Sequence, residues 1–274
     1  MTGGSIEVRE LGVDFGGLRA LSALSFSAPA GRIKAVIGPN GAGKSTLFNV
    51  ISGLQAPSTG EVLLDGAPLA GLAPHARVRS GLARTFQNLQ VFTGMTVLEN
   101  VLVGRHTRLR TGVAGALARL PSGRREEREA RDYCLSVLER VGLARHAHAA
   151  VTALSFGDLK IVEIARALAS EPRVLLLDEP TAGLPAAEAA RVAGVIESIN
   201  AQGVTVLLVE HNMRVVMSIS HDILVLNFGR SIAEGDPATV RRHPEVVAAY
   251  LGSDARTVGR AAGETAGQPA GDPA

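Results

Sequence analysis

The sequence lacks the features that mark a secreted or membrane-embedded protein. It has 274 residues and one cysteine, Cys134, which cannot form an internal disulfide. The first residues show no basic segment followed by an apolar core, so no secretory signal peptide is expected. No run of about 18 apolar residues occurs, so no segment is expected to cross a bilayer. We therefore expect a protein that stays in the cytoplasm and reaches a membrane only through another protein.

The chain also has little net charge. Its 28 basic and 26 acidic side chains give a formal charge of +2. Such a small excess does not by itself indicate a nucleic-acid partner, so the partner has to be identified from motifs. The length suffices for one large α/β domain, or for a core with a smaller appended subdomain.

A glycine-rich segment between a strand pattern and a helix pattern is the most informative feature present. It fits G-x-x-x-x-G-K-[ST] and directly follows the apolar stretch Ile33–Ile37. Glycines let successive backbone N–H groups point at phosphate oxygens, while Lys44 can reach the β- and γ-phosphates and the Ser45 hydroxyl can ligate Mg²⁺. We expect the phosphates of a nucleotide to be held by Gly38, Pro39, Asn40, Gly41, Ala42, Gly43, Lys44, Ser45 and Thr46.

Short apolar runs alternate with helical patterns along the chain. Four of them, at residues 33–37, 174–177, 205–209 and 223–226, are rich in Val, Leu and Ile and are not polar at alternate positions. Such runs are typical of strands buried on both faces of a parallel sheet. Residues 84–170 have mostly helical patterns and predict an inserted helical subdomain. The expected fold class is therefore α/β.

Two adjacent carboxylates, Asp178 and Glu179, end the apolar run that starts at Val174. Because successive strand residues point to opposite faces, the two side chains are aimed differently. Asp178 is placed to hold the Mg²⁺ shell, and Glu179 to polarise an attacking water in phosphoryl transfer. Two solvated acids at the end of a strand are the simpler alternative.

A third motif precedes a helical pattern and lies between the glycine-rich segment and the acidic pair. It consists of Leu154, Ser155, Phe156, Gly157 and Asp158. Here the chain resembles the ATP-binding cassette (ABC) family, whose signature L-S-G-G-Q opens a helix at this point, and the resemblance covers almost the full chain. It implies that Ser155 and the Gly157 N–H, with the positive helix end, contact the γ-phosphate of ATP on a second ATPase subunit. Two chains would then sandwich two nucleotides.

The same resemblance implies roles for three further residues. Gln87 is similar to the glutamine that senses Mg²⁺ and water and faces a transmembrane partner. His211 is similar to the switch histidine at the γ-phosphate, and Phe15 to the aromatic residue that stacks on adenine, with a core position as the alternative for Phe15. Catalysis is thus expected from Glu179, His211 and Gln87, and Mg²⁺ binding from Ser45, Gln87 and Asp178.

The resemblance also implies a domain plan. Residues 1–252 would form one P-loop ATPase domain with a mainly parallel central sheet, an N-terminal antiparallel β subdomain and a helical subdomain at about residues 88–168. Residues 253–274 are rich in Ala, Gly, Asp, Pro, Arg and Thr without apolar periodicity. Such a segment cannot bury enough surface to offset its ordering entropy, so we expect a disordered tail.

The chain resembles one branch of the family more closely. The features that carry this resemblance are residues 84–97, the length of the helical insert and residues 243–252. These features are similar to the larger of the two ATPase subunits of bacterial branched-chain amino acid importers. The implied partners are a second ATPase subunit in a homo- or heterodimer, two transmembrane permease subunits and, indirectly, a periplasmic solute-binding protein. The chain would lie at the cytoplasmic face of the inner membrane. Similar ATPases serve urea, amide and other amino-acid importers, so the solute stays open.

Two positions depart from the family pattern. Asp158 stands where the signature usually has Gln and places a carboxylate near a polyphosphate site, which Lys160 would partly offset. We expect this charge to act as an electrostatic brake on ATP-dependent dimerisation. Pro185 stands where an Asp or Asn usually crosses the dimer interface. We expect it to begin the next helix, where its missing N–H costs nothing.

Two other functions fit the same motifs. A soluble ABC protein acting on nucleic acid or ribosomes usually has tandem cassettes or long coiled-coil inserts, which this sequence lacks, so no nucleic-acid partner is expected. An ATP-dependent dimerisation module with low turnover fits the unusual Asp158 and Pro185, but the intact Glu179 and His211 argue against it. We therefore favour the ATPase of an importer.

Overall fold

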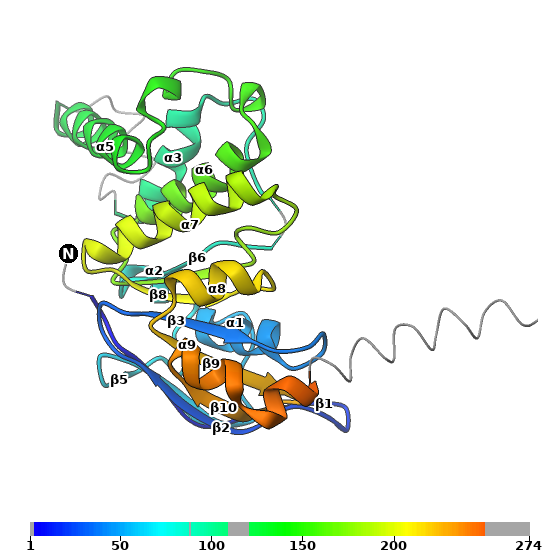
Figure 1. The fold of residues 1–274 in the computed structure, drawn as a ribbon. Coiled ribbons are helices and arrows are strands. Elements are labelled where there is room, and N and C mark those ends of the chain that lie inside the picture. The colour runs from blue at the N-terminus through cyan, green and yellow to red at the C-terminus, as the bar shows by residue number, and fades with distance from the viewer. Residues whose placement is uncertain (1–2, 88, 109–120, 250–274) are drawn as a thin grey trace, which may run out of the picture.

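The computed structural model describes residues 3–87, 89–108 and 121–249 as two β sheets with helices packed around them (Figure 1). Asn88 and the tail at residues 253–274 lie outside the described residues. Side chains of the larger sheet enter three different hydrophobic clusters, so this sheet lies at the centre of the fold.

The larger sheet has six strands in the order β10-β9-β3-β8-β7-β6. They are β3 (Ile33–Ile37), β6 (Leu82–Arg84), β7 (Val174–Asp178), β8 (Thr205–Val209), β9 (Asp222–Asn227) and β10 (Arg230–Gly235). All neighbouring strands are parallel except β9 and β10. Every residue of β3, β7 and β8 is buried. The four strands predicted from apolar runs and the mainly parallel central sheet are therefore confirmed.

The second sheet is antiparallel, with four strands in the order β2-β1-β4-β5. They are β1 (Ile6–Phe15), β2 (Leu18–Ala28), β4 (Thr59–Leu64) and β5 (Ala67–Pro68). Apolar side chains of this sheet share a cluster with α1 (Lys44–Ser52) and with one face of the central sheet. Helix α1 is thereby fixed between the two sheets, and the expected antiparallel β subdomain is confirmed.

Three helices form a group at one end of the molecule, at the top of Figure 1. They are α3 (Val97–Arg105), α5 (Pro121–Arg140) and α6 (Phe156–Leu168), with the short 3₁₀ turns η1 (His106–Arg108), η2 (Ala144–His146) and η3 (Val151–Ala153). Other helices are α2 (Pro74–Arg79), α7 (Ala186–Ala201), α8 (Met213–Ile219) and α9 (Pro237–Arg242). None of the helices within the described ranges combines the length and the apolar character that a bilayer crossing requires. The helical group fits the expected helical subdomain, whose boundaries at about residues 88–168 stay a prediction.

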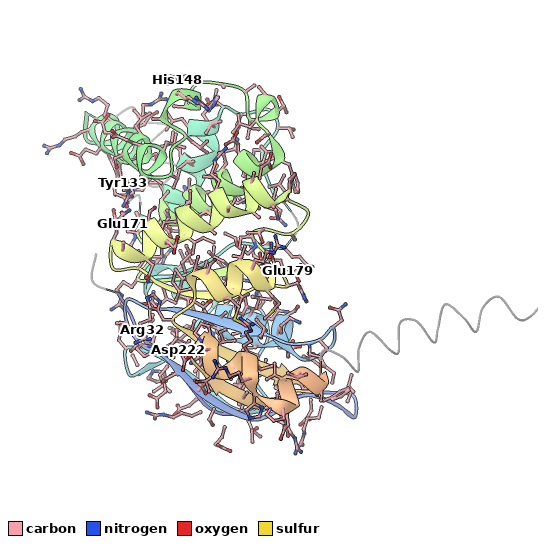
Figure 2. All side chains as sticks on the ribbon, viewed as in Figure 1. Arg32, Tyr133, His148, Glu171, Glu179 and Asp222 are labelled. Carbon is pink, nitrogen blue, oxygen red and sulfur yellow. The ribbon has the colours of Figure 1, made fainter. Side chains whose placement is uncertain are left out.

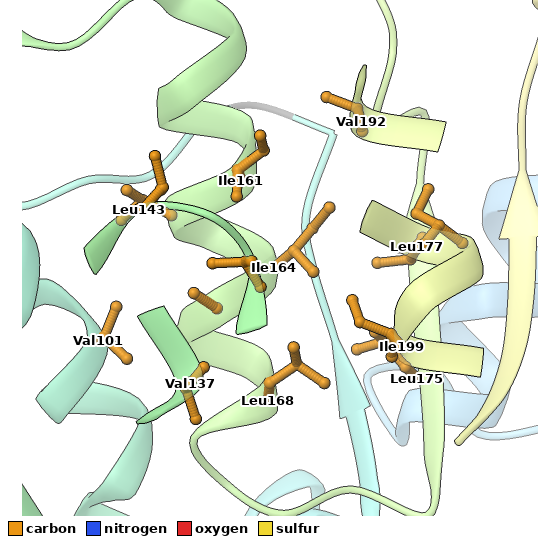
Figure 3. Close-up of a cluster of buried hydrophobic side chains, with 14 of the residues drawn as sticks. Val101, Val137, Leu143, Ile161, Ile164, Leu168, Leu175, Leu177, Val192 and Ile199 are labelled. Carbon is orange, nitrogen blue, oxygen red and sulfur yellow. The ribbon is translucent and has the colours of Figure 1, made fainter. Parts of the chain in front are cut away.

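Within this group, α6 lies between the other two helices, α3 and α5, and strand β7 of the central sheet (Figure 3). Ile164 on α6 belongs to one buried cluster with Val101 of α3 and Val137 of α5, and the same cluster contains Leu175 of β7 and Ile199 of α7. Burying each such side chain stabilises the fold by about 1.5–3 kcal/mol relative to exposing it. One continuous core therefore fixes the start of α6, which carries the signature motif, relative to the central sheet.

Candidate active site

Four adjacent strands of the central sheet lead to the residues that the motifs identify. Strand β3 runs into the glycine-rich loop, β7 ends with Asp178, and β8 and β6 are followed by His211 and Gln87. The carboxyl ends of parallel strands lie at one edge of a sheet, where open α/β folds bind ligands. Figure 2 shows Glu179 at this edge, beside α8. The fold thus brings together residues from four separate parts of the sequence.

The loop between β3 and α1 has a backbone that requires glycine. Gly38 has a φ of 149°, and a Cβ there would lie 2.1 Å from the carbonyl oxygen of Leu226. Gly43 has a φ of 105°, and a Cβ there would lie 2.8 Å from the carbonyl oxygen of Ala20. Because Gly43 is the N-cap residue of α1 and offers no side chain, the first N–H groups of the helix can donate to an anion.

Lys44, the first residue of α1, is buried beneath this loop. Its Nζ donates to the carbonyl oxygens of Gly38, at 2.7 Å, and Pro39, at 3.0 Å. The pKa of Lys44 is lowered, because the effect of burial outweighs the raising effect of the Glu179 and Asp178 charges. The ammonium therefore lies where the phosphate loop and the acidic strand end meet.

Glu179 is in contact with both other residues expected to act in catalysis. His211 Nε2 lies 2.9 Å from Glu179 Oε1, and Gln87 Nε2 donates to Glu179 Oε2 over 3.2 Å. The backbone of Glu179 has a φ of 50°, which is rare for a residue other than glycine and is often found at functional sites. Its N–H donates to the carbonyl oxygen of Val209 at 2.8 Å, which fixes the acid beside the end of β8.

Asp178 is held by an arginine that the sequence analysis does not identify. Arg84 Nη2 donates to Asp178 Oδ2 at 3.0 Å, and both side chains are less than a tenth exposed. Arg84 Nη1 donates to Asn49 Oδ1 and Ser52 Oγ of α1, at 2.8 and 2.9 Å. The guanidinium therefore joins the acidic strand end to the helix that follows the phosphate loop. The only feature of the sequence that could have indicated a role for Arg84 is its position three residues before Gln87.

The donors expected for Mg²⁺ have the chemistry that this ion prefers. Mg²⁺ takes oxygen ligands, usually one or two from the protein and others from water and phosphates. Among the described residues Asp178 uses Oδ2 for Arg84, which leaves its other carboxylate oxygen for a cation. Gln87 uses its amide nitrogen for Glu179, which leaves its amide oxygen. Together with the exposed Ser45 hydroxyl at the start of α1, these groups fit a hydrated divalent cation.

The signature motif forms the N-terminus of α6. Ser155 is its N-cap residue, and its hydroxyl accepts from the Asp158 N–H at 3.2 Å and donates to Asp158 Oδ2 at 3.1 Å. The carboxylate of Asp158 forms an ion pair with Arg191 of α7. Arg191, and not the expected Lys160, is therefore the cation that offsets the unusual acid of this motif.

Lys160 instead belongs to a polar row on α6 that holds Gln87 and Gln90. Its Nζ donates to the carbonyl oxygen of Gln87 at 3.3 Å. One turn further, Glu163 accepts from the Gln90 N–H at 2.8 Å, and Arg166 donates to the carbonyl oxygen of the same residue. Burial raises the pKa of Glu163, against the lowering effect of that hydrogen bond and of the Lys160 and Arg166 charges. The segment that carries Gln87 is thus attached to the helix that carries the signature.

Two expectations about single residues need correction. Phe15 ends β1 and is 46% exposed, so the alternative that it is a core residue is wrong, while its stacking on adenine stays a prediction. Pro185 does not begin the next helix but is its N-cap residue, because α7 begins at Ala186. The Pro185 carbonyl accepts the first bond of that helix, from the Ala189 N–H at 2.9 Å.

Known proteins resemble this chain over most of its length. The sequence profile described as ABC transporter matches residues 21–182. The high-affinity branched-chain amino acid transport ATP-binding proteins BraF of Pseudomonas aeruginosa and LivG of Escherichia coli are each 42% identical over 248 residues, which cover 90% of this chain and 97% of theirs. This chain belongs to the ABC transporter family. A second profile, described as branched-chain amino acid ATP-binding cassette transporter, matches residues 230–256 of this ABC protein.

A solved structure supports the fold of the ABC protein. An ATP-binding cassette of an ABC transporter, solved in its ADP conformation, is 32% identical with a TM-score of 0.80, and the match covers 92% of this chain and 100% of that one. The P-loop ATPase fold is therefore confirmed. Nucleotide binding and ATP hydrolysis, the activity of this family, are confirmed with it.

Proposed function

We propose that this ABC protein is the ATP-hydrolysing subunit of a bacterial importer that takes up branched-chain or other amino acids. The observation that carries the proposal is the 42% identity to BraF and LivG over 90% of the chain. The C-terminal match at residues 230–256 supports the same branch of the family. The chain would act at the cytoplasmic face of the inner membrane with a second ATPase subunit, two permease subunits and, indirectly, a periplasmic solute-binding protein.

Within this function the site separates phosphate binding from water activation. The N–H groups of residues 38–46 and Lys44 would hold the phosphates of ATP. Mg²⁺, held by Ser45, Gln87 and Asp178, would neutralise charge on the β- and γ-phosphates. Glu179 would take a proton from the attacking water, and its contacts with His211 and Gln87 support this orientation of the carboxylate.

The proposed contact with a permease is a groove beside Gln87. Its volume is about 530 Å³, and it lies between the residues after β6 and helices α3 and α6. Phe86, Phe92 and Val103 line it and are 40%, 47% and 39% exposed. Apolar side chains that gather at a polar surface favour a protein partner. Because Gln87 and Gln90 are both bonded to α6, a partner in this groove would contact the signature helix and Gln90, close to Gln87.

Crosslinking tests this contact and the proposed function with it. A cysteine at the exposed Thr93 is expected to capture an integral membrane protein when crosslinked in membranes. The native Cys134 is fully buried, and burial raises the pKa of its thiol to about 11, so it should not react. Ser231→Cys on β10, at the opposite end of the molecule from α3 and α6 in Figure 1, is the control and should capture no permease.

The captured complex also tests the solute. Purified with its partners, it should hydrolyse ATP faster when a solute-binding protein loaded with leucine, isoleucine or valine is added. Capture of soluble proteins only, by Thr93→Cys, would contradict the importer and favour an ABC protein acting on nucleic acid or ribosomes.

The proposed dimer predicts opposite effects for the two members of the Asp158–Arg191 pair. Asp158→Gln removes a negative charge near the ATP of the second subunit and should strengthen ATP-induced dimerisation by roughly 1 kcal/mol at low salt. Arg191→Gln exposes that charge and should weaken dimerisation, because the ion pair is lost. Both effects should shrink as salt screens them, and sedimentation with and without ATP would measure them.

Thermal unfolding of the same variants provides the control. Asp158 also stabilises the N-terminus of α6, and losing an acid there costs about 0.3–1 kcal/mol of fold stability. If Asp158→Gln lowers the melting temperature but leaves dimerisation at low salt unchanged, Asp158 is a helix-end residue and the electrostatic brake is wrong.

A further inference from the structure

Glu210 is a buried carboxylate for which neither the motifs nor the proposed mechanism has a use. It directly follows β8, and only 2% of its surface is exposed. A charged group at such a position costs folding free energy unless hydrogen bonds compensate it. The partners that compensate it therefore indicate what the residue holds together.

Each carboxylate oxygen of Glu210 binds a different segment. Oε1 accepts from the N–H of Thr181 at 2.8 Å and from the Thr181 hydroxyl. Oε2 accepts from the N–H groups of His211 and Asn212, at 2.8 and 3.0 Å. The carboxylate thus bridges the loop after β7 to the loop after β8.

These two loops carry the two residues whose side chains meet at the proposed catalytic site. Thr181 lies two residues after Glu179, and His211 follows Glu210 directly. The side chain of His211 is 44% exposed, so little packing orients it, and its position depends on the backbone that Glu210 binds. The left-handed backbone conformation of Glu179, with a φ of 50°, is also unfavourable by itself and is kept only when neighbouring groups fix it.

We propose that Glu210 is a positioning residue that sets the contact between Glu179 and His211. The proposal rests on the catalytic roles proposed above for these two residues. By fixing both loops with one carboxylate, Glu210 keeps His211 Nε2 at the observed 2.9 Å from Glu179 Oε1. Misplacing a catalytic group by about 1 Å can lower a rate about 100-fold, so a loosened contact should reduce turnover strongly.

A structural anchor for the start of α8 is the competing explanation. That helix, however, already has a cap of its own, because Asn212 Oδ1 accepts from the N–H of Arg214 at 3.2 Å. In addition, half of the Glu210 bonds go to Thr181, which α8 does not contain. Holding the loops after β7 and β8 together therefore explains the bonds of Glu210 better than anchoring the start of α8 alone.

Glu210→Gln tests the proposal, because the amide keeps the shape but replaces one acceptor oxygen by a donor facing N–H groups. We expect kcat for ATP hydrolysis to fall by about 10- to 100-fold, with the Kd for ATP changed less than about twofold. The same substitution is then made in a His211→Ala background. There it should lower kcat less than about threefold further, because residues that act as a unit are not additive.

Two other variants keep the test decisive. Thr181→Val removes one donor to Glu210 and should show a smaller fall in kcat with the same loss of additivity, even if Glu210→Gln folds poorly. Thr205→Val lies at the other end of β8, where the fully buried hydroxyl accepts from the Gly31 N–H and donates to the Gly4 carbonyl. It should lower the melting temperature but not kcat per folded molecule.

The outcomes separate this inference from the proposed function. If His211→Ala loses turnover but Glu210→Gln keeps the wild-type rate, the positioning role alone is wrong. Equal fold losses from Glu210→Gln in the wild-type and His211→Ala backgrounds would also overturn it, because a loss of folded protein acts equally in both. If His211→Ala itself turns over ATP at the wild-type rate, the proposed role of the histidine fails and the inference fails with it.

Discussion

Lys44→Ala is expected to abolish tight ATP binding, whereas Glu179→Gln should keep ATP binding and stop turnover. The lysine lies at the carbonyl groups of the phosphate loop, and its loss removes the cation that faces the phosphates. The glutamine keeps the size of Glu179 but cannot accept a proton from water. General-base catalysis contributes about 10²- to 10⁴-fold, so kcat should fall by that factor. Nucleotide titration and steady-state phosphate release would measure the two effects separately.

Glu197→Gln is the matched control for the acid. This glutamate is exposed on α7, and its substitution should change neither ATP binding nor turnover. Wild-type hydrolysis by Glu179→Gln would show that another group activates the water. The mechanism proposed for this site would then be wrong.

The strands of the central sheet could be predicted because their burial has a simple sequence pattern. Strand β3 is buried at all its residues and is apolar at all but Lys34. Strands β1 and β2 lack this uninterrupted apolar pattern, because their pairing is irregular. The ladder between them contains register shifts, and two non-glycine residues, Glu10 and Ala23, have positive φ. The antiparallel sheet was accessible only through the family resemblance. Uninterrupted apolar runs thus predict doubly covered strands, whereas an irregular half-exposed sheet needs tertiary information.

The sequence predicted which residues would meet at the proposed catalytic site, but not the residues that hold them there. Glu179, His211 and Gln87 have motifs, and the structure places them in contact. For Asp158 the nearby Lys160 was expected as the compensating charge. Residues two apart on a helix do not face each other, so the ion pair is formed by Arg191 of another helix instead. Supporting residues act across long separations in sequence, where no local pattern identifies them.

Arg84 is the buried example of such a residue, and its loss should destabilise the fold strongly. It is separated from its partner Asp178 by 94 positions, and their side chains are 8% and 6% exposed. Its guanidinium also lies 5.6 Å and 5.3 Å from the ring centres of Phe48 and Phe86. Removing one member of a buried ion pair leaves the other charge uncompensated in the interior, which typically costs about 3–5 kcal/mol.

Arg84→Met should therefore lower the free energy of unfolding by about 3–5 kcal/mol, measured by urea denaturation without nucleotide. Methionine fills a similar volume, so the loss reports charge and hydrogen bonds more than a cavity. The control is Arg32→Met, which breaks a pair with Asp222 in which the arginine is 46% exposed, and which should cost no more than about 1 kcal/mol. Figure 2 labels both residues of that control pair. If the two variants lose similar stability, the Arg84–Asp178 pair does not support the fold, because a buried charge left without a partner must cost more than an exposed one.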